Sequence, residues 1–198
     1  MNNLRNALAS ARTITLFALT GLTLGASVLL AAPNPVAQVQ KGDGNKDVAA
    51  SATGGGHYLI AGFIDVKFSL SAKEKEDGTA LGQFRQSLVF QDLGIDFHGE
   101  VTCVTVDAEN GRAWIGAIIT QNNSEHPFYT TERTQPGRDV WFRVLDSGEG
   151  QSEPDRTTFL GFEGDGDIIT SEDYCDLAIW PDDNARTSPV TQGDIQVR

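Results

Sequence analysis

Three ionisable residues, Asp96, His98 and Glu100, alternate along a segment that has the pattern of a β-strand. Alternation places their side chains on one face of that strand, opposite apolar side chains. A histidine between two carboxylates can ligate a metal ion or act as a general acid or base. Side chains two positions apart on a strand are about 6.6–7 Å apart, however, which is wide for the ligands of one metal ion.

The alternative interpretation of this face is a solvent-exposed strand surface, on which the two acids stabilise the charged form of His98. We favour the exposed surface unless the strand belongs to a closed barrel whose interior the polar face lines. Inside a barrel the same groups would be desolvated, and acid–base chemistry would become the better explanation. The direction in which this face points therefore decides between the two interpretations.

Two further histidines, His57 and His126, could complete a three-histidine zinc site with His98. The sequence contains no H-x-H or H-E-x-x-H pattern, and nothing in the spacing brings the three residues together. We therefore do not expect a zinc site.

An acidic segment, Glu163-Gly-Asp-Gly-Asp167, offers alternating oxygen ligands of the kind that calcium binds. The helical calcium loop needs a glycine at its sixth position and a glutamate at its twelfth, where this chain has Ile168 and Tyr174. We expect a solvated acidic loop that keeps the protein soluble. Calcium at Glu163, Asp165 and Asp167 is the alternative, and we expect no other cofactor.

One segment, Leu145-Asp-Ser-Gly148, is similar to the catalytic loop of aspartic proteases. Those enzymes need two such aspartates that share a proton, and this sequence has one copy. A turn after a strand explains the segment without chemistry. The sequence also lacks a G-x-S-x-G motif, so no serine nucleophile is indicated.

The elements that must position these residues are strands. Apolar residues at every second position predict one long strand from Tyr58 to Leu70, with a bend at Gly62. Similar alternation predicts strands at 84–90 and 95–107.

A hairpin connects the strand at 95–107 to the next one. Asn110-Gly111 predicts a two-residue turn, which would place Glu109 opposite Arg112. The strand that follows, 112–121, is apolar on both faces, and we expect it to be central and covered on both sides.

The remaining pattern predicts a single all-β domain at 57–198. Further strands are expected at 139–145, 157–162 and 193–197, and no long window has helical periodicity. About seven to eight strands with hairpin connections favour an antiparallel β-barrel, with a two-sheet β-sandwich as the alternative.

The first 32 residues have the organisation of a secretory signal peptide. Arg5 and Arg12 precede an uncharged, mostly apolar run that ends at Ala31-Ala32. We expect cleavage there, a flexible linker at 33–56, a secreted location (extracellular or periplasmic) and no membrane span after cleavage. An uncleaved run of this length could span a bilayer.

Two cysteines, Cys103 and Cys175, would then reside in an oxidising compartment, where they have a single intramolecular pairing. We expect a disulfide, with two buried free thiols as the alternative. The chain has 27 acidic and 15 basic side chains, a formal charge of −12. This charge argues against nucleic acids and anionic membrane surfaces as partners, since both bind through clustered Lys and Arg.

Five segments of the domain form a distinctive combination: His98-Gly-Glu-Val-Thr-Cys-Val-Thr-Val-Asp107, Asn110-Gly-Arg-Ala-Trp-Ile-Gly116, Val140-Trp-Phe-Arg-Val-Leu-Asp-Ser-Gly-Glu-Gly150, Glu172-Asp-Tyr-Cys175 and Gly193-Asp-Ile-Gln-Val-Arg198. Together they resemble a group of uncharacterised secreted bacterial all-β proteins, over residues 57–198. The resemblance implies export, an all-β fold and a disulfide between the two cysteines. It implies no catalytic residues, because that group has no established activity.

Two functions remain open at this point. The first is a secreted, non-catalytic domain that binds a small molecule or a surface partner. The second is a small β-barrel enzyme, a hydrolase or an isomerase, that uses Asp96, His98 and Glu100 inside the barrel.

Overall fold

The computed structural model describes residues 47–166 and 168–198. The predicted signal peptide, linker residues 33–46 and Asp167 lie outside this part of the chain. Most regular structure in the described part is β, as predicted. The strands are β1 (Val48–Ile60), β2 (Ile64–Lys75), β3 (Ala80–Phe90), β4 (Leu93–Asp107), β5 (Arg112–Asn122), β6 (Asp139–Leu145), β7 (Arg156–Thr157), β8 (Gly161–Phe162) and β9 (Ser188–Val197). The helices are α1 (Ser171–Leu177) and the short 3-10 turns η1 (Ala108–Asn110), η2 (Pro127–Tyr129), η3 (Glu132–Thr134) and η4 (Asp182–Asn184).

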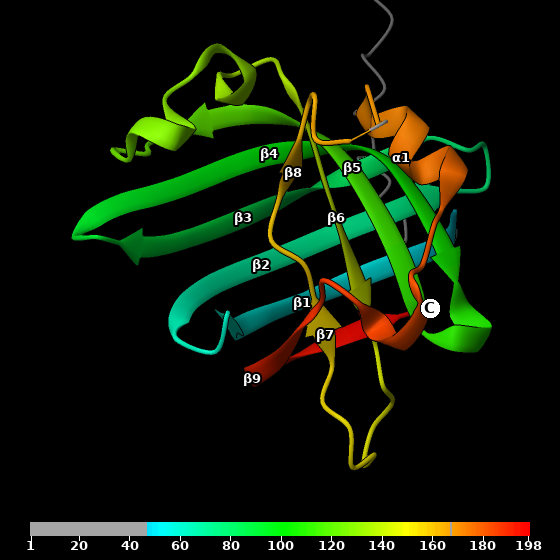
Figure 1. Cartoon of the computed structure of the whole chain (residues 1–198). Helices are drawn as coiled ribbons and strands as arrows, with labels where there is room; N and C mark the ends of the chain where they lie inside the picture. Colours follow the sequence, from blue (N-terminus) through cyan, green and yellow to red (C-terminus); the bar gives the residue numbers. More distant parts are fainter. Residues whose placement is uncertain (1–46, 167) are drawn as a thin grey trace, which may run out of the picture. The chain divides into compact units, whose positions relative to one another are not determined.

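All nine strands belong to one antiparallel sheet that closes into a ring (Figure 1). The order is β5-β4-β3-β2-β1-β9-β7-β6, and pairing of β5 with β6 closes it. The short strand β8 pairs with β6 at the opposite end from β7. Because the sheet closes, few strand edges remain open to pairing with other chains. Exposed edges of antiparallel sheets are a common cause of aggregation.

The core fills the inside of the ring. Alternating side chains of each long strand point inward, as β2 illustrates with Val66, Phe68, Leu70 and Ala72, all nearly or fully buried. Phe97 and Phe142 reach the same cluster from β4 and β6. Burial of such side chains is the main favourable contribution to folding.

The first hairpin corrects the prediction of one long strand. The chain turns at residues 61–63, where Ala61 and Gly62 adopt positive φ, and Ile64 then pairs with Ile60. Even-numbered residues face inward in both β1 and β2. The apolar alternation therefore continues unbroken in the sequence across this turn. Periodicity alone could not reveal the reversal.

The predicted linker also ends earlier than expected, because β1 begins at Val48. Residues 48–56 pair with β2 on one side, and residues 52–58 pair with β9 on the other. The small residues Gly54 and Gly56 belong here because backbone atoms of β9 occupy the space that a side chain would need. The small residues at 48–56 therefore reflect close packing of β1 in the sheet. They do not form part of a flexible linker.

The β4–β5 connection is longer than the predicted two-residue turn. Asp107, not Glu109, lies opposite Arg112, and η1 occupies the loop between them. The Asp107 carboxylate accepts hydrogen bonds from the backbone and side-chain amides of Asn110, which stabilise the wider turn. The predicted strand at 157–162 is likewise divided into β7 and β8.

The outer face of β5 is covered by α1 and the segment around it, as the apolar pattern of β5 required. Trp114 and Trp141 pack there against Tyr174 of α1. The Cys103–Cys175 disulfide joins β4 to α1 and confirms the predicted pairing. Within the described residues, no helix is both long and apolar enough to cross a membrane.

Candidate functional site

The three alternating residues of β4 lie on the outer face of the ring. Ile95 and Phe97 point into the core, so Asp96, His98 and Glu100 point toward solvent. The Asp96 and His98 side chains keep 19% and 34% of their accessible surface, and Glu100 is exposed. The condition for a catalytic site in a closed interior is therefore not met.

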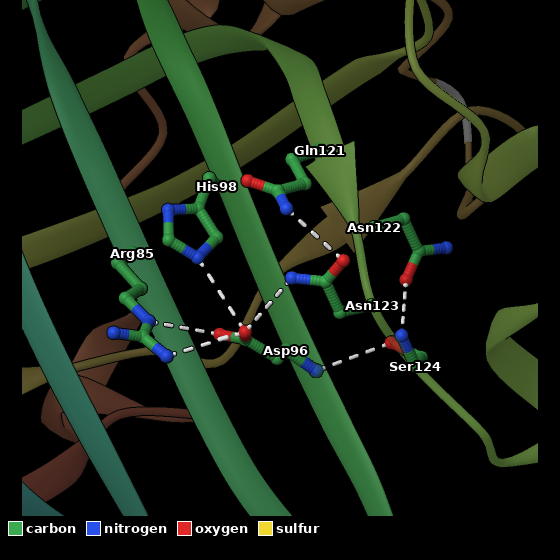
Figure 2. A network of polar contacts seen from close by, with 7 residues as sticks. All are labelled: Arg85, Asp96, His98, Gln121, Asn122, Asn123 and Ser124. Atoms are coloured by element: carbon green, nitrogen blue, oxygen red, sulfur yellow. Dashed lines mark hydrogen bonds and ion pairs between the residues drawn. The ribbon is translucent and has the colours of Figure 1, made fainter.

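Asp96 is the centre of a polar network on this face (Figure 2). Arg85 on β3 donates from Nε at 2.9 Å and from a terminal nitrogen at 3.2 Å to its two carboxylate oxygens. Asn123 donates to the carboxylate at 3.3 Å, and His98 Nε2 lies 3.4 Å from it. Glu100 makes no side-chain hydrogen bond or ion pair with this network in the described residues.

The surroundings shift the pKa of Asp96 in opposing directions. Partial burial raises it, but the hydrogen bonds from Arg85 and Asn123 and the positive charges of Arg85 and His98 outweigh the burial. The pKa of Asp96 therefore lies below its ordinary value. The carboxylate stays ionised near neutral pH and is a poor proton acceptor, so it serves as an anchor rather than as a general base.

The same network fixes the segment that leaves β5. Asn123 donates its backbone N–H to the Asp96 carbonyl at 2.9 Å, and Asp96 donates its own to Ser124 Oγ at 3.2 Å. Asn122 donates from Nδ2 to the carbonyls of Tyr129 and Thr134, both at 2.7 Å. Residues 122–134 are thereby folded back over one end of the ring.

A cavity of about 370 Å³ lies at that end, which we call the end cavity. Its lining residues come from the β1–β2 and β3–β4 hairpins, from residues 126–129 and from Phe159. The two hairpin connections and residues 123–135 lie on the left of Figure 1. Its walls are almost entirely apolar or aromatic. They consist of Ile60, Ile64, Leu88, Phe90, Ile95, His126, Phe128, Tyr129 and Phe159.

Aromatic contacts hold the wall of the end cavity in place. The His126 ring lies 5.6 Å from Phe90 and 5.9 Å from Tyr129, measured between ring centroids. Tyr129 also meets Phe97 at 5.8 Å and Phe159 at 5.9 Å, both edge to face. Such pairs add to the free energy of burial and restrict rotamers, so the cavity is shaped before any ligand enters.

His126 is one of two polar residues, with Tyr129, in the wall of the end cavity. His126 is 9% exposed, and its Nδ1 accepts a hydrogen bond from the backbone N–H of Phe128 at 3.3 Å. An accepting Nδ1 places the ring proton on Nε2. No partner for Nε2 is found among residues 47–166 and 168–198, so that N–H is free to donate to a ligand.

A shallower groove of about 790 Å³ adjoins the end cavity on the outer surface. The β2–β3 pairing stops at Val66 and Leu88, so the tips of the two hairpins separate. The groove crosses this gap, and Ile64, Leu88, Phe90 and Ile95 line both it and the end cavity. Phe63 and Val89 stand exposed beside it. The gap therefore offers a second approach to the apolar interior.

The other predicted site residues are dispersed. His57 pairs with Asp65 at 3.1 Å across the β1–β2 hairpin. No cluster of three or more potential metal-ligating side chains occurs in the described part of the chain. The two described calcium candidates are held by arginines instead: Glu163 by Arg138 at 3.4 Å and Asp165 by Arg133 at 2.8 Å.

The Asp-Ser-Gly segment has a structural role. Asp146 accepts backbone hydrogen bonds from Gly148 at 2.7 Å and from Val197 at 2.9 Å. The first bond closes the turn and the second attaches the final strand β9. Both oxygens of the Asp146 carboxylate accept structural hydrogen bonds in this way. The carboxylate is therefore not available to share a proton with a second aspartate, as the catalytic residues of aspartic proteases do.

The end cavity was not predicted from the sequence, and its function must be inferred from geometry. Comparisons of the chain with family models, curated proteins and solved structures find no match. A usable signal was present in His126-Pro-Phe-Tyr129, an aromatic group inside a loop otherwise rich in polar residues. Aromatic residues in a surface loop are an indication of binding when they share a cavity.

Proposed function

We propose that this protein is a secreted β-barrel domain that binds a small, largely apolar molecule in the end cavity. The observation that supports this most directly is an apolar, preshaped cavity whose wall includes two polar side chains, His126 and Tyr129, that can donate a hydrogen bond. The mouth of a β-barrel is a common position for ligand sites, which are mostly apolar with a few polar groups that fix orientation.

The size of the end cavity limits the ligand. Its volume of about 370 Å³ lies within the range of small-molecule sites. An apolar cavity of roughly 150 Å³ already holds benzene. A ligand with one or two rings, or a short branched chain, therefore fits best, with a single acceptor for His126 Nε2.

The anchored loop explains how such a ligand could be bound without a large rearrangement. Residues 122–134 carry His126 and Tyr129, and Asp96 and Asn122 fix them by several hydrogen bonds. Ordering a loop on binding costs free energy, and a loop that is already ordered avoids that cost. In this proposal Asp96 and His98 support the binding wall and carry no chemistry.

The enzymatic alternative is less well supported. It required Asp96, His98 and Glu100 to line the interior, and they face outward instead. The disulfide between Cys103 and Cys175 supports a secreted location, since such bonds persist in oxidising compartments. Membership of the secreted bacterial group that the sequence resembles remains part of this proposal.

The proposal can be tested with N-phenyl-naphthylamine, an uncharged aromatic probe whose fluorescence rises in apolar surroundings. We expect saturable binding by the wild-type domain. Ile64→Trp fills the end cavity from β2 and should weaken binding at least tenfold. Leu81→Trp adds the same ring on the outer face of β3, at a residue that does not line the end cavity or the groove beside it, and should leave binding unchanged.

Two results would overturn the proposal. One is the absence of saturable binding by the wild-type domain. The other is equal affinity of the probe for the wild type and for Ile64→Trp, with both proteins folded by circular dichroism.

A further inference from the structure

A second cavity, of about 490 Å³, lies on the outer side of the ring. It is lined by β6, by residues 158–161, 165, 166 and 168, and by residues between Tyr174 of α1 and Arg186. We call it the Arg143 cavity. The residues that matter below are Trp141, Arg143, Tyr174, Leu177, Ile179 and Arg186.

Arg143 is a buried cation without a counterion. Its side chain is 7% exposed, and it donates from one terminal nitrogen to the Ala185 carbonyl at 2.8 Å. Its Nε is buried and has no hydrogen-bond partner. No carboxylate lies within 4.0 Å of its guanidinium among residues 47–166 and 168–198, whereas Arg85, Arg133 and Arg138 all pair with acids.

The lack of a counterion is costly in general. Arg112 is in a similar position, since its Nε is also buried without a hydrogen-bond partner in the described residues and its guanidinium lies 5.1 Å from the Trp180 ring centroid. Buried charges are normally paired, because an unpaired charge in a low-dielectric interior loses its hydration without compensation. Trp180 offers partial compensation, since Arg143 lies 5.2 Å from its ring centroid.

The other ionisable groups in the cavity do not neutralise Arg143. Burial raises the pKa of Tyr174 to about 12, against the opposing effects of the Arg143 charge and of a hydrogen bond with Arg143, so this phenol is uncharged at physiological pH. Asp165 is paired with Arg133 and also accepts a hydrogen bond from the Phe162 backbone N–H. Arg186 is exposed at the rim and adds a second positive charge.

The rest of the Arg143 cavity is suited to an apolar or aromatic body. Trp141 and Tyr174 stack with their ring centroids 5.9 Å apart and an interplanar angle of 23°. Leu177 and Ile179 are 56% and 59% exposed beside them. Exposed aliphatic side chains beside a positively charged cavity are best explained by a ligand that carries both an anionic group and apolar surface.

We propose that the Arg143 cavity binds a small aromatic anion, whose carboxylate or sulfonate meets Arg143 and Arg186 while its rings pack against Leu177 and Ile179. The ligand supplies the negative charge that the described residues do not place beside Arg143, and an acceptor for its buried Nε. Guanidinium groups are well suited to this task because they remain charged and donate in a fixed planar geometry. This site is distinct from the end cavity, although Phe159 borders both.

Anilinonaphthalene sulfonate is a suitable probe, because it has the ring system of N-phenyl-naphthylamine with an added sulfonate. Binding is measured by fluorescence titration in the Ile64→Trp background, in which the end cavity is filled. We expect saturable binding that weakens as the salt concentration rises.

Arg143→Met should weaken binding of the sulfonate probe at least tenfold, and Arg186→Gln several-fold. The matched control Lys73→Gln removes a cation from β2, away from the cavity, and should change nothing. In the Ile64 wild-type background, Arg143→Met should leave binding of the uncharged probe intact. The charged and the uncharged probe therefore test the two proposals independently.

The proposal is wrong if the folded Arg143→Met and Arg186→Gln variants bind the sulfonate probe as tightly as their parent does. It is also wrong if Lys73→Gln weakens binding as much as they do, since the effect would then be one of net charge. Should Arg143→Met fail to fold, Arg186→Gln alone decides the question, because that side chain is exposed.

Discussion

Tyr58 donates a hydrogen bond from its hydroxyl to Gln86 Oε1 at 2.8 Å and so links β1 to β3 inside the ring. The strand between them, β2, contributes only apolar side chains to this interior. Both Tyr58 and Gln86 are almost completely buried, and burial raises the pKa of Tyr58 well above its ordinary value. Gln86 Nε2 in turn donates to the Thr158 carbonyl at 3.4 Å. The pair thus ties two strands to the β7–β8 connection.

We predict that Tyr58→Phe lowers the free energy of unfolding by about 1–3 kcal/mol, because Gln86 Oε1 is left buried without a donor. The double variant Tyr58→Phe/Gln86→Met removes both polar groups and should recover most of that loss. Urea denaturation of the three proteins measures both effects. A Tyr58→Phe variant as stable as the wild type would contradict the prediction.

This pair also marks a limit of sequence-based reasoning. The alternation of β3 correctly placed Phe84 and Leu88 on the inner face, and Gln86 lies between them on that same face. Nothing local explains a glutamine there, since the carbonyl that it contacts belongs to Thr158, 72 residues away. Alternation predicts which residues face inward, but it does not predict which buried polar groups will find partners.

The helix α1 shows a second limit. Its seven residues, Ser171–Leu177, form too few turns for helical periodicity to be recognised. Its formation depends on a capping box between Thr170 and Asp173 and on the bond between Cys175 and Cys103. The sequence predicted the disulfide but not the helix that carries one of its cysteines.

The candidate site was predictable in part. Alternation placed Asp96 and His98 on one face, and the structure brings them together. The apolar residues Ile95 and Phe97 determined that this face points outward, which the sequence alone left open because the closure of the sheet was not known. His126 and Tyr129 could not be assigned to a cavity, since their position depends on hydrogen bonds from Asn122 across a loop.

The lowered pKa of Asp96 predicts a specific dependence of stability on pH. Since the folded-state pKa lies below that of the unfolded chain, about 3.9, ionised Asp96 stabilises the fold above that pH. The contribution is lost as the pH falls through the lower folded-state value. We expect Asp96→Asn to be less stable than the wild type at pH 6, and we expect the difference to shrink as the pH falls below about 4.

The control for this prediction is Glu100→Gln, which removes a carboxylate from the same face of β4 without breaking the network around Asp96. Urea denaturation at several pH values compares the three proteins. A stability difference between Asp96→Asn and the wild type that stays constant from pH 6 to about pH 3 would show that ionisation of Asp96 is not responsible.

The disulfide should contribute strongly to stability. Cys103 and Cys175 are separated by 72 positions, and closing a loop of that length stabilises by about 4 kcal/mol in the chain-entropy model. We expect Cys103→Ala/Cys175→Ala to melt several degrees lower than the wild type, measured by calorimetry without reductant. Hydrogen exchange should rise most in α1 and its flanking loops. Uniformly faster exchange in the whole ring would argue against a local role of the bond.

Gly116 should not tolerate a side chain. It lies on β5 beneath α1, and a Cβ atom there would meet Cys103 Sγ and the Ser171 carbonyl. We predict that Gly116→Ala destabilises the fold by about 1–3 kcal/mol through overpacking. Gly94→Ala is the matched control, because a Cβ at Gly94 would meet only Glu125, at an ordinary distance of 3.7 Å. Equal melting temperatures of the two variants would contradict this packing argument.

Asn122 should control the end cavity without forming part of its wall. Its side chain donates to the carbonyls of Tyr129 and Thr134 and accepts from the Ser124 N–H, so Asn122→Ala releases three contacts within the loop. We expect faster hydrogen exchange confined to residues 123–135. Binding of N-phenyl-naphthylamine should weaken several-fold, because the released loop must be ordered again when the ligand binds.

The neighbouring substitution Asn123→Ala is the matched control for Asn122→Ala. It removes the same side chain one position later, where the described contacts are surface hydrogen bonds to Asp96 and Gln121. The expected effect on probe affinity is therefore smaller. If Asn122→Ala and Asn123→Ala weakened binding equally, the side-chain bonds of Asn122 could not be what holds the cavity wall. If Asn122→Ala accelerated exchange in the loop and left affinity unchanged, the loop would not form the binding wall, and the ligand would have to rest on β1–β4 alone.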